Sequence, residues 1–381
     1  MQSSFCTTCD LDLGQFAKLC GQEANLGDYP HAKAIAQNAV LYAAADLLAA
    51  DEIAIKTELN RCLKDGPGLL VVQETFPDAV LDRSTELFNE IIAAEKAVGD
   101  HRGDHFAKPG ANERIWNSMQ KVCEKDPAAF IDYYSNAILA LLAESWLGPY
   151  YQITAQVNIV KPGGQSQSAH RDYHLGFQEN ALVAQFPVHL QVASQFMTLQ
   201  GAIAHTNMPV ETGPTLYLPF SQQYPLGYLA WRDSAFKTYF DEHAVQLPLQ
   251  KGDAVFLSPA LFHAAGANTT ADQDRVANLV QISAAFGKTM ETVNHDTMLR
   301  CTYPLLLERA TRQTIDDGDL QRIATALADG YSFPTNLDLD PPIDGSAPAT
   351  CRDLLLQALA QRWPVEEFNA ALAAHAERRQ A

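Results

Sequence analysis

The chain has 381 residues, of which 47% are hydrophobic and 19% charged, a balance that can bury a large core and argues against disorder. Its 45 acidic residues outnumber 27 basic ones, and the formal net charge of −18 makes nucleic acid and anionic membrane surfaces poor partners. The opening residues lack a signal-peptide pattern, no apolar run is long enough to span a membrane, and seven scattered cysteines form no disulfide pattern. We therefore expect a cytoplasmic protein.

The first 76 residues combine a cysteine-bearing start with an Ala-rich stretch. Cys6 and Cys9 form a CxxC pair near Cys20, but no further zinc ligands follow. A frayed N-terminal arm is thus favoured over a metal or redox site. Residues 31–64 contain no Gly or Pro and are rich in Ala and Leu, which predicts a helix. The segment 65–76, "DGPGLLVVQETF", predicts a turn followed by a short buried strand.

The rest of the chain changes from helical to alternating periodicity and back. Helices are predicted over 77–97 and 128–148, with a polar loop over 99–114 between them. After residue 288 the chain is predicted to be helical again, with an extended strap over 331–348 and a last helix over 350–381 that breaks at Pro364. Between these helical parts, strands are predicted at 150–164, 189–201, 213–221, within 245–270, and at 274–287.

This layout predicts one domain over 1–381 with a mainly β core and flanking helices. The core over 65–288 has short strands punctuated by Gly and Pro, in roughly the number of a jelly roll. Residues 1–64 form an N-terminal helical extension and residues 289–381 a C-terminal one. These extensions are expected to shape the substrate pocket or a subunit contact, so a homodimer through them is an open expectation.

A cluster of chemically active side chains stands in "SAHRDYHLGF", residues 168–177. His170 and Asp172 are two positions apart, so in extended chain both side chains project from the same face. Non-haem Fe(II) oxygenases bind the metal through two histidines and one carboxylate on one face of an octahedron. The alternative is a polar turn between strands. The metal interpretation requires a second histidine from elsewhere in the β core.

His263 and Arg275 are the distant residues that complete such a site. His263 stands at the end of the apolar run "GDAVFLSPALFH", where it can reach a barrel opening; the alternative is a satisfied core histidine. Arg275 opens the next predicted strand, and a buried guanidinium needs a partner such as a carboxylate ligand. The alternative is a solvent-facing arginine paired with Asp272 or Asp274.

Other polar residues near these positions have weaker signals. Gln156 and Asn158 alternate along one strand and can point into a barrel. Arg171 should face away from a metal held by its two neighbours, and His174 is a candidate for substrate contact only. The remaining histidines considered are expected to be structural or exposed: His189, His205, His243 and His295.

Four segments occur in a fixed order: "HRD", "ETGPTLYLPFSQQY", "KGDAVFLSPALFHAAGANTT" and "DRVANLVQIS". Together they resemble the phytanoyl-CoA dioxygenase family of Fe(II)- and 2-oxoglutarate-dependent oxygenases, over about 65–288. The resemblance implies a double-stranded β-helix, a jelly-roll, cupin-like fold. It also implies that His170, Asp172 and His263 bind the metal and that Arg275, with Asn158, binds 2-oxoglutarate. One departure is "PFSQ", where the family usually has "PGSH", which indicates an altered loop near the mouth.

The resemblance implies an activity as well as a fold. With Fe(II), 2-oxoglutarate and O2, the enzyme would hydroxylate an aliphatic C–H bond of a small-molecule metabolite and release succinate and CO2. Retention of Asp172 favours hydroxylation, although desaturation or ring formation stays open. The rival functions are a non-catalytic jelly-roll binding protein and a cupin-type metalloenzyme that does not use 2-oxoglutarate. Arg275 argues against the cupin alternative, because cupins do not need an arginine twelve residues after the last ligand.

Overall fold

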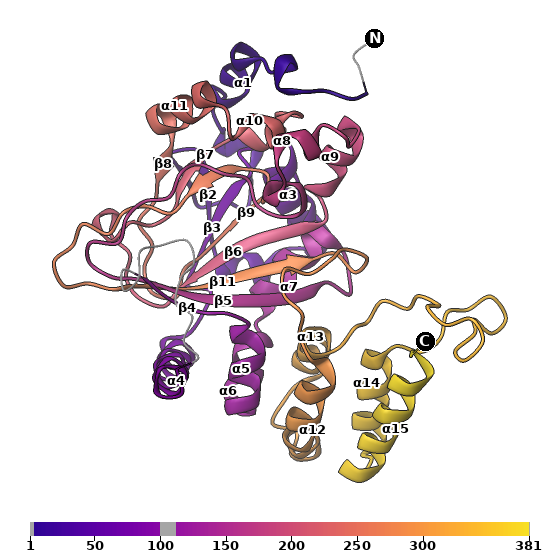
Figure 1. Ribbon diagram of the computed structural model, residues 1–381. Helices are drawn as coiled ribbons and strands as arrows, with labels where there is room; N and C mark the ends of the chain where they lie inside the picture. Colours follow the sequence, from indigo (N-terminus) through magenta and orange to yellow (C-terminus); the bar gives the residue numbers. More distant parts are fainter. Residues whose placement is uncertain (1–3, 100–111, 381) are drawn as a thin grey trace.

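A computed structural model describes residues 4–99 and 112–380 (Figure 1). Within them, eight strands form a large mixed sheet in the order β1-β2-β3-β9-β6-β11-β5-β4, and three form a small sheet in the order β10-β7-β8. The β2–β3 pair is parallel, whereas the other pairs are antiparallel. The strands are β1 (Ala34–Ala36), β2 (Ala39–Ala43), β3 (Leu69–Gln73), β4 (Asn112–Ile115), β5 (Gln152–Val160), β6 (Thr198–Ala204), β7 (Leu216–Leu218), β8 (Val245–Gln246), β9 (Ala254–Leu257), β10 (Phe262–Ala264) and β11 (Arg275–Ser283).

Helices cover one face of the large sheet, while the small sheet lies over the other (Figure 1). The helices are α1 (Leu13–Cys20), α2 (Ala44–Ala49), α3 (Glu52–Lys64), α4 (Asp78–Ala97), α5 (Ser118–Lys125), α6 (Pro127–Tyr134), α7 (Ala137–Leu147), α8 (Asn180–Val183), α9 (Val188–Ser194), α10 (Gly227–Ala230), α11 (Ser234–His243), α12 (His295–Arg312), α13 (Asp317–Leu327), α14 (Cys351–Gln361) and α15 (Val365–Arg378). The expected β core with flanking helices is therefore confirmed at the level of a large sheet and its helical layer.

The two faces of the large sheet carry different side chains because strand residues alternate. On β11, Val280 and Ile282 pack into the core shared with the helices. The intervening Arg275, Leu279 and Gln281 line a cavity on the opposite face. Strand β11 pairs along its whole length with β5, from Arg275–Val160 to Ser283–Gln152, and with β6 on its other side. The central strands therefore place polar side chains on the cavity face and apolar ones under the helices.

The predicted helix over 31–64 was wrong in its first third. Residues 34–43 form the hairpin β1–β2, and helices α2 and α3 follow it. Gln37 and Asn38 have φ of 49° and 66° and connect the two strands in a tight two-residue turn, the type that favours hairpins. Pairing of β2 with β3 buries Val40 and Tyr42 completely. Non-local strand pairing outweighs the local helix preference of the alanines.

Two further predictions need correction, and a third falls partly outside the residues that the structure describes. The predicted strand over 189–201 is helix α9 followed by β6. The N-terminal arm is not frayed over the residues described, because α1 inserts Phe16 among aromatic rings that include Tyr224 and Phe262. Of the predicted polar loop over 99–114, residues 100–111 lie outside the described part of the chain, and Asn112–Ile115 forms β4.

The C-terminal extension packs against the helical face rather than against the small sheet. Helix α12 contacts α5 and α6, and the Sγ atoms of Cys123 and Cys301 lie 3.6 Å apart at this contact. Tyr303 of α12 stacks on Phe368 of α15 with ring centroids 3.9 Å apart. The strap over 331–348 has neither helix nor strand, as expected. Among the described residues, no helix is both long and apolar enough to cross a membrane.

His205 is a structural histidine, as the sequence indicated, and is held neutral in the core. Thr85 Oγ1 donates to the carbonyl of Leu81 and so accepts from His205 Nδ1 at 2.8 Å. The Tyr133 hydroxyl, which accepts from the Asn278 amide, donates to His205 Nε2 at 3.0 Å. Burial lowers the pKa of His205 from 6.5 to about 3. Each ring nitrogen is thus satisfied only by the neutral imidazole.

This network predicts acid-dependent stability. Between pH 6.5 and pH 3 the unfolded chain protonates His205 while the folded chain does not, so the folded state loses stability as pH falls. From about pH 7 to about pH 5, the wild type should lose about 2 kcal/mol more unfolding free energy than His205→Gln. Urea unfolding of both proteins at the two pH values measures the difference. Equal losses would mean that His205 titrates normally in the folded state.

Candidate metal centre

His170 and His263 are brought together by a two-residue bridge between distant parts of the chain. His170 N–H donates to the His263 carbonyl at 2.9 Å, and His263 N–H donates to the His170 carbonyl at 3.1 Å. Their ring centroids lie 4.4 Å apart. His263 lies within β10, which is anchored to β7 through the pair His263–Tyr217. The small sheet therefore fixes one histidine, and the bridge fixes the other.

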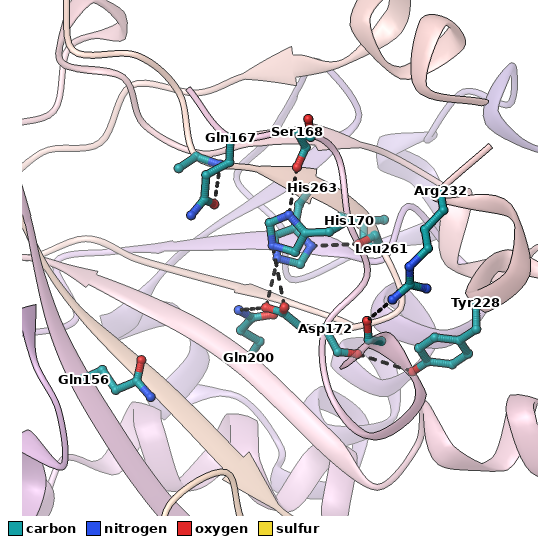
Figure 2. A network of polar contacts seen from close by, with 12 residues as sticks. Gln156, Gln167, Ser168, His170, Asp172, Gln200, Tyr228, Arg232, Leu261 and His263 are labelled. Carbon is teal, nitrogen blue, oxygen red and sulfur yellow. Dashed lines mark hydrogen bonds and ion pairs between the residues drawn. The ribbon is translucent and has the colours of Figure 1, made fainter. Parts of the chain in front are cut away.

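Asp172 faces both imidazoles (Figure 2). Its Oδ1 lies 3.6 Å from His170 Nε2, and its Oδ2 lies 3.2 Å from His263 Nε2. The backbone N–H of Asp172 donates to the carbonyl of Pro259 at 3.1 Å and holds the segment in place. One nitrogen or oxygen atom from each of the three side chains lies within 4.8 Å of the others, a grouping that could hold a metal ion.

Backbone carbonyls set the tautomer of both histidines. His170 Nδ1 lies 3.0 Å from the Ser168 carbonyl, and His263 Nδ1 lies 2.8 Å from the Leu261 carbonyl. A carbonyl only accepts, so each Nδ1 carries the proton, and in the neutral ring each Nε2 presents a lone pair toward Asp172. Lone pairs facing a carboxylate require a cation between them, either a metal ion or a proton on one ring. Such carbonyl contacts are the usual way in which metal-binding histidines are oriented.

Burial and neighbouring groups shift the pKa values of the three side chains in different directions. Burial pushes the pKa of Asp172 upward, but His170 and the hydrogen bonds from His263 and Gln200 hold it well below its usual range. Burial also opposes protonation of His263, yet the hydrogen bond and charge of Asp172 raise its pKa overall. Burial lowers the pKa of His170, with His263 adding to the effect. Asp172 is therefore ionised, as a metal-binding carboxylate must be.

The cluster opens into a cavity of about 550 Å³ between the large sheet and the small one. Its walls combine neutral polar, aromatic and cationic side chains, and Asp172 is the one carboxylate that lines it within the described residues. Besides the cluster itself, the lining includes Arg114, Trp116, Gln156, Asn158, Gln167, Ser168, Phe177, Gln200, Tyr217, Trp231, Arg275, Leu279, Gln281 and Met290.

Arg275 begins β11, as predicted, and its side chain is buried in the cavity wall. Only 5% of it is exposed, so the solvent-facing alternative was wrong. One Nη donates to the carbonyl of Gly213, and the other donates to Asn158 Oδ1 at 3.0 Å. Gly213 has φ of 74°, and a Cβ there would lie 2.4 Å from the carbonyl oxygen of Ala267. This glycine permits the close backbone approach that positions the guanidinium.

The neighbouring strands supply further polar side chains. Asn158 and Gln156 are buried on β5 and face the cavity, as the alternation predicted. Gln156 Oε1 accepts from Arg114 Nη1 at 2.9 Å. Arg114 was missed because its stretch had been predicted to be a polar loop. Gln200 on β6 was also missed; its Nε2 donates to Asp172 Oδ2 at 2.8 Å. The sequence signal that could have identified Gln200 is the presence of a glutamine inside an apolar run.

The remaining candidates lie apart from the cluster. His174 lies in the 3₁₀ turn η3 (His174–Phe177) and lines a second cavity of about 540 Å³ beside α8 and α9. Two of the other histidines are exposed, His189 and His243, while His295 is half-buried, and its Nδ1 lies 2.7 Å from the Leu327 carbonyl.

Arg171 lies between the two predicted ligands but reaches into the core. It is 1% exposed, and its Nη2 donates to the carbonyls of Ser221 and Tyr224 at 2.6 and 3.2 Å. The guanidinium lies over the rings of Tyr228 and Phe262, 5.3 Å from each centroid. Burial lowers its pKa to about 10. Arg171 thus ties the segment that carries His170 and Asp172 to the chain that follows β7.

Replacing Arg171 with methionine should destabilise the fold around the cluster. The change removes two buried hydrogen bonds donated by a charged group, which should lower the unfolding free energy by about 2 kcal/mol. Urea unfolding measures it, with Arg83→Met as the control, because the Arg83–Asp126 ion pair is half-exposed. If both variants lose a similarly small amount of unfolding free energy, Arg171 does not stabilise this segment more than a surface arginine does.

The segment "PFSQ", where the family usually has "PGSH", forms a turn directly after β7. Phe220 has φ of 67°, a left-handed conformation that glycine adopts readily, and its side chain is buried. Gln222 donates through Nε2 to the Gly66 carbonyl at 2.8 Å. The phenylalanine and glutamine therefore join the core strand β7 to the turn that follows α3, which is the physical consequence of the altered loop.

The model of the phytanoyl-CoA dioxygenase (PhyH) family matches residues 65–277. The chain belongs to this family. A similar protein is "Dioxygenase af480" of Aspergillus fumigatus, 26% identical over 190 residues. That match covers 50% of this chain and 56% of the relative, so the chain spans only about half the length of this curated relative.

Two solved structures show a partial similarity to the chain. One is the non-haem α-ketoglutarate-dependent epimerase SnoN from nogalamycin biosynthesis, at 17% identity and a TM-score of 0.41 over 62% of this chain and 85% of that one. Another is AviO1 from Streptomyces viridochromogenes, at 17% identity and a TM-score of 0.43 over 62% of this chain and 97% of that one.

Proposed function

We propose that this protein is an Fe(II)- and 2-oxoglutarate-dependent dioxygenase whose two sheets form a double-stranded β-helix. The observation that carries the proposal is the convergence of His170, Asp172 and His263 at a cavity whose wall holds the buried Arg275. Family membership supports the same function independently. The predicted division into one domain with two helical extensions, and a homodimer through them, stay predictions.

The donor set fits a non-haem iron centre. Two imidazole nitrogens and one carboxylate oxygen are the protein ligands of the facial triad. The carbonyl-fixed tautomers and the ionised Asp172 leave the three donor atoms in the states that metal binding requires. Bound Fe(II) would supply the oxidising chemistry that converts 2-oxoglutarate and O2 to succinate and CO2 and inserts oxygen into a substrate C–H bond.

Arg275 and Asn158 are the residues proposed to hold 2-oxoglutarate. A guanidinium binds a carboxylate with two parallel hydrogen bonds, and burial strengthens such bonds. Asn158 Oδ1 accepts from one Nη of Arg275 and so orients the guanidinium in the wall. A cavity of about 550 Å³ has room for this cosubstrate and a small second molecule. The substrate is accordingly a small metabolite, hydroxylated at an aliphatic carbon.

Anaerobic titration tests the proposal directly. Fe(II) added to the protein with 2-oxoglutarate should give a weak visible charge-transfer band, and admission of O2 should then release succinate. Omission of 2-oxoglutarate is the matched control for the band. A protein that develops no band and forms no succinate would favour the two rival functions, a non-catalytic jelly-roll binding protein or a cupin-type metalloenzyme that does not use 2-oxoglutarate.

A further inference from the structure

We propose that Gln200 is a positioning residue of the metal centre, because it holds the carboxylate of Asp172 from the large sheet. The inference rests on the proposed function, which it deepens by adding a residue that acts on a proposed ligand. Among the described side chains of the large sheet, Gln200 is the one that hydrogen-bonds a proposed ligand. Its Nε2 donates to Asp172 Oδ2 at 2.8 Å (Figure 2).

The proposed ligands are otherwise held by segments outside the large sheet. The Ser168 and Leu261 carbonyls orient the two imidazoles, and a backbone bridge joins His170 to His263. Strand β10, which carries His263, pairs with β7 of the small sheet. These contacts fix the backbone and the rings. None of them fixes the carboxylate of Asp172, which can rotate about its last side-chain bond.

Gln200 supplies the hydrogen bond that this carboxylate otherwise lacks. In the tautomer that the backbone carbonyls set, Nε2 of His170 and Nε2 of His263 each carry a lone pair and donate nothing to Asp172. The Gln200 amide donates in every protonation state of the rings, and a hydrogen bond to an ionised oxygen is stronger than one between neutral groups. Within the described part of the chain, Gln200 is therefore the donor that restricts the carboxylate when the rings are ready for a metal ion.

The register of the large sheet brings Gln200 to this place. Within β6, Gln200 pairs with Leu257 of β9 on one side and with Gln281 of β11 on the other, so its backbone is held from both sides. Two residues beyond Leu257, the carbonyl of Pro259 accepts from the N–H of Asp172 at 3.1 Å. Gln200 and the backbone of Asp172 are thus anchored next to each other on β9 and its continuation.

A restricted carboxylate favours metal binding. A ligand that already has its bound orientation loses less conformational freedom when the metal binds. Hydrogen-bond partners of metal ligands typically contribute about 10- to 100-fold to metal affinity or activity. Methionine has nearly the length of glutamine but no N–H group. We therefore expect Gln200→Met to fill the same space and to bind the metal more weakly.

Metal binding without turnover tests this role. Co(II), titrated anaerobically into the metal-free protein in competition with a chelating dye, gives an affinity that needs neither 2-oxoglutarate nor O2. Gln200→Met should bind Co(II) at least about tenfold more weakly than the wild type. The matched control is Gln281→Met, which changes the opposite residue of the same wall and should keep the affinity of the wild type. Equal affinities in the two variants would overturn the proposal.

A double-mutant cycle separates positioning from a general effect on the fold. In the metal-free protein, Gln200→Met should lower the urea midpoint, because it removes a hydrogen bond to a charged group. In an Asp172→Ala background this bond is already absent, so the same change should lower the midpoint no further. Equal shifts in both backgrounds would show that Gln200 acts on the wall and not through Asp172, which contradicts the proposal.

Activity gives a second separation. In Gln200→Met, the Fe(II) concentration for half-maximal succinate formation should rise. The 2-oxoglutarate concentration for half-maximal activity at saturating Fe(II) should match that of the wild type, because Arg275 is unchanged. A variant in which the 2-oxoglutarate requirement rises and the Fe(II) requirement does not would contradict the positioning role.

A shorter side chain covers the case in which Gln200→Met does not fold. Gln200→Asn keeps the amide but is one carbon shorter, so its nitrogen falls short of Asp172 Oδ2. This variant should also bind Co(II) about tenfold more weakly, with Gln281→Asn as its control. Wild-type Co(II) affinity in Gln200→Asn would reject the role.

The proposed function and the role of Gln200 fail separately. Co(II) binding that depends on Gln200, in a protein that develops no charge-transfer band with Fe(II) and 2-oxoglutarate, would reject the dioxygenase and keep the positioning role. A band in a protein whose Co(II) affinity is the same in Gln200→Met would keep the dioxygenase and reject the positioning role.

Discussion

Replacing Asp172 with alanine should reduce Fe(II)-dependent succinate formation by at least about 100-fold. Loss of a residue that only orients a metal ligand already costs about 10–100-fold in metal affinity or activity, and Asp172 is proposed to be a ligand itself. The change also removes the carboxylate to which both imidazoles and Gln200 point. Equilibrium dialysis with Fe(II) under nitrogen and a succinate assay measure both effects.

The matched control is Asp272→Ala, because Asp272 is exposed and close in sequence to Arg275. Circular dichroism of both variants separates loss of the site from loss of the fold. An Asp172→Ala protein that is folded and fully active would remove the carboxylate from the metal centre and would refute the proposed ligand set.

Replacing Arg275 with leucine should raise the 2-oxoglutarate concentration for half-maximal activity by about 10- to 100-fold. A hydrogen bond to a charged group contributes about 1.5–3 kcal/mol, and 1.4 kcal/mol corresponds to a tenfold change in affinity. Initial rates over a range of 2-oxoglutarate concentrations measure the change. The half-maximal 2-oxoglutarate concentration of Arg275→Lys should lie between those of the wild type and Arg275→Leu, because lysine keeps the charge but not the two parallel hydrogen bonds of arginine.

Fe(II) binding without 2-oxoglutarate should be unchanged in Arg275→Leu, which distinguishes a lost cosubstrate contact from collapse of the wall. Arg83→Leu, at a half-exposed ion pair, serves as the control for removal of an arginine. An unchanged 2-oxoglutarate requirement in Arg275→Leu would place the anion site elsewhere in the cavity.

The residues proposed to do the chemistry could be found in the sequence because their side chains are unusual where they stand. His263 and Arg275 interrupt or begin apolar strands, and the short spacing of His170 and Asp172 already puts both on one face. The structure brings all four to one cavity. The family resemblance supplied their grouping across about 100 residues, which no local pattern could have given.

The glutamines of the cavity wall could not be found in the same way. Gln200 and Gln281 become neighbours only through the register of β6 against β11, a pairing between segments about 80 residues apart. A single glutamine in a strand is equally compatible with a solvent-facing position. The same limit explains the wrong helix over 31–43, where pairing with β3 decides the conformation of an Ala-rich segment that would be helical by local preference.

Phe16 packs beside Phe262, so we expect the N-terminal helix and the β core to fold as one cooperative unit. Phe262 precedes His263 in β10, so the first helix supports the strand that carries a proposed ligand. The hairpin β1–β2 likewise covers the edge of β3. The family match begins at residue 65, yet a chain truncated there would expose both surfaces. We expect such a fragment to aggregate, because the segment that the family match covers is shorter than the segment that must fold together.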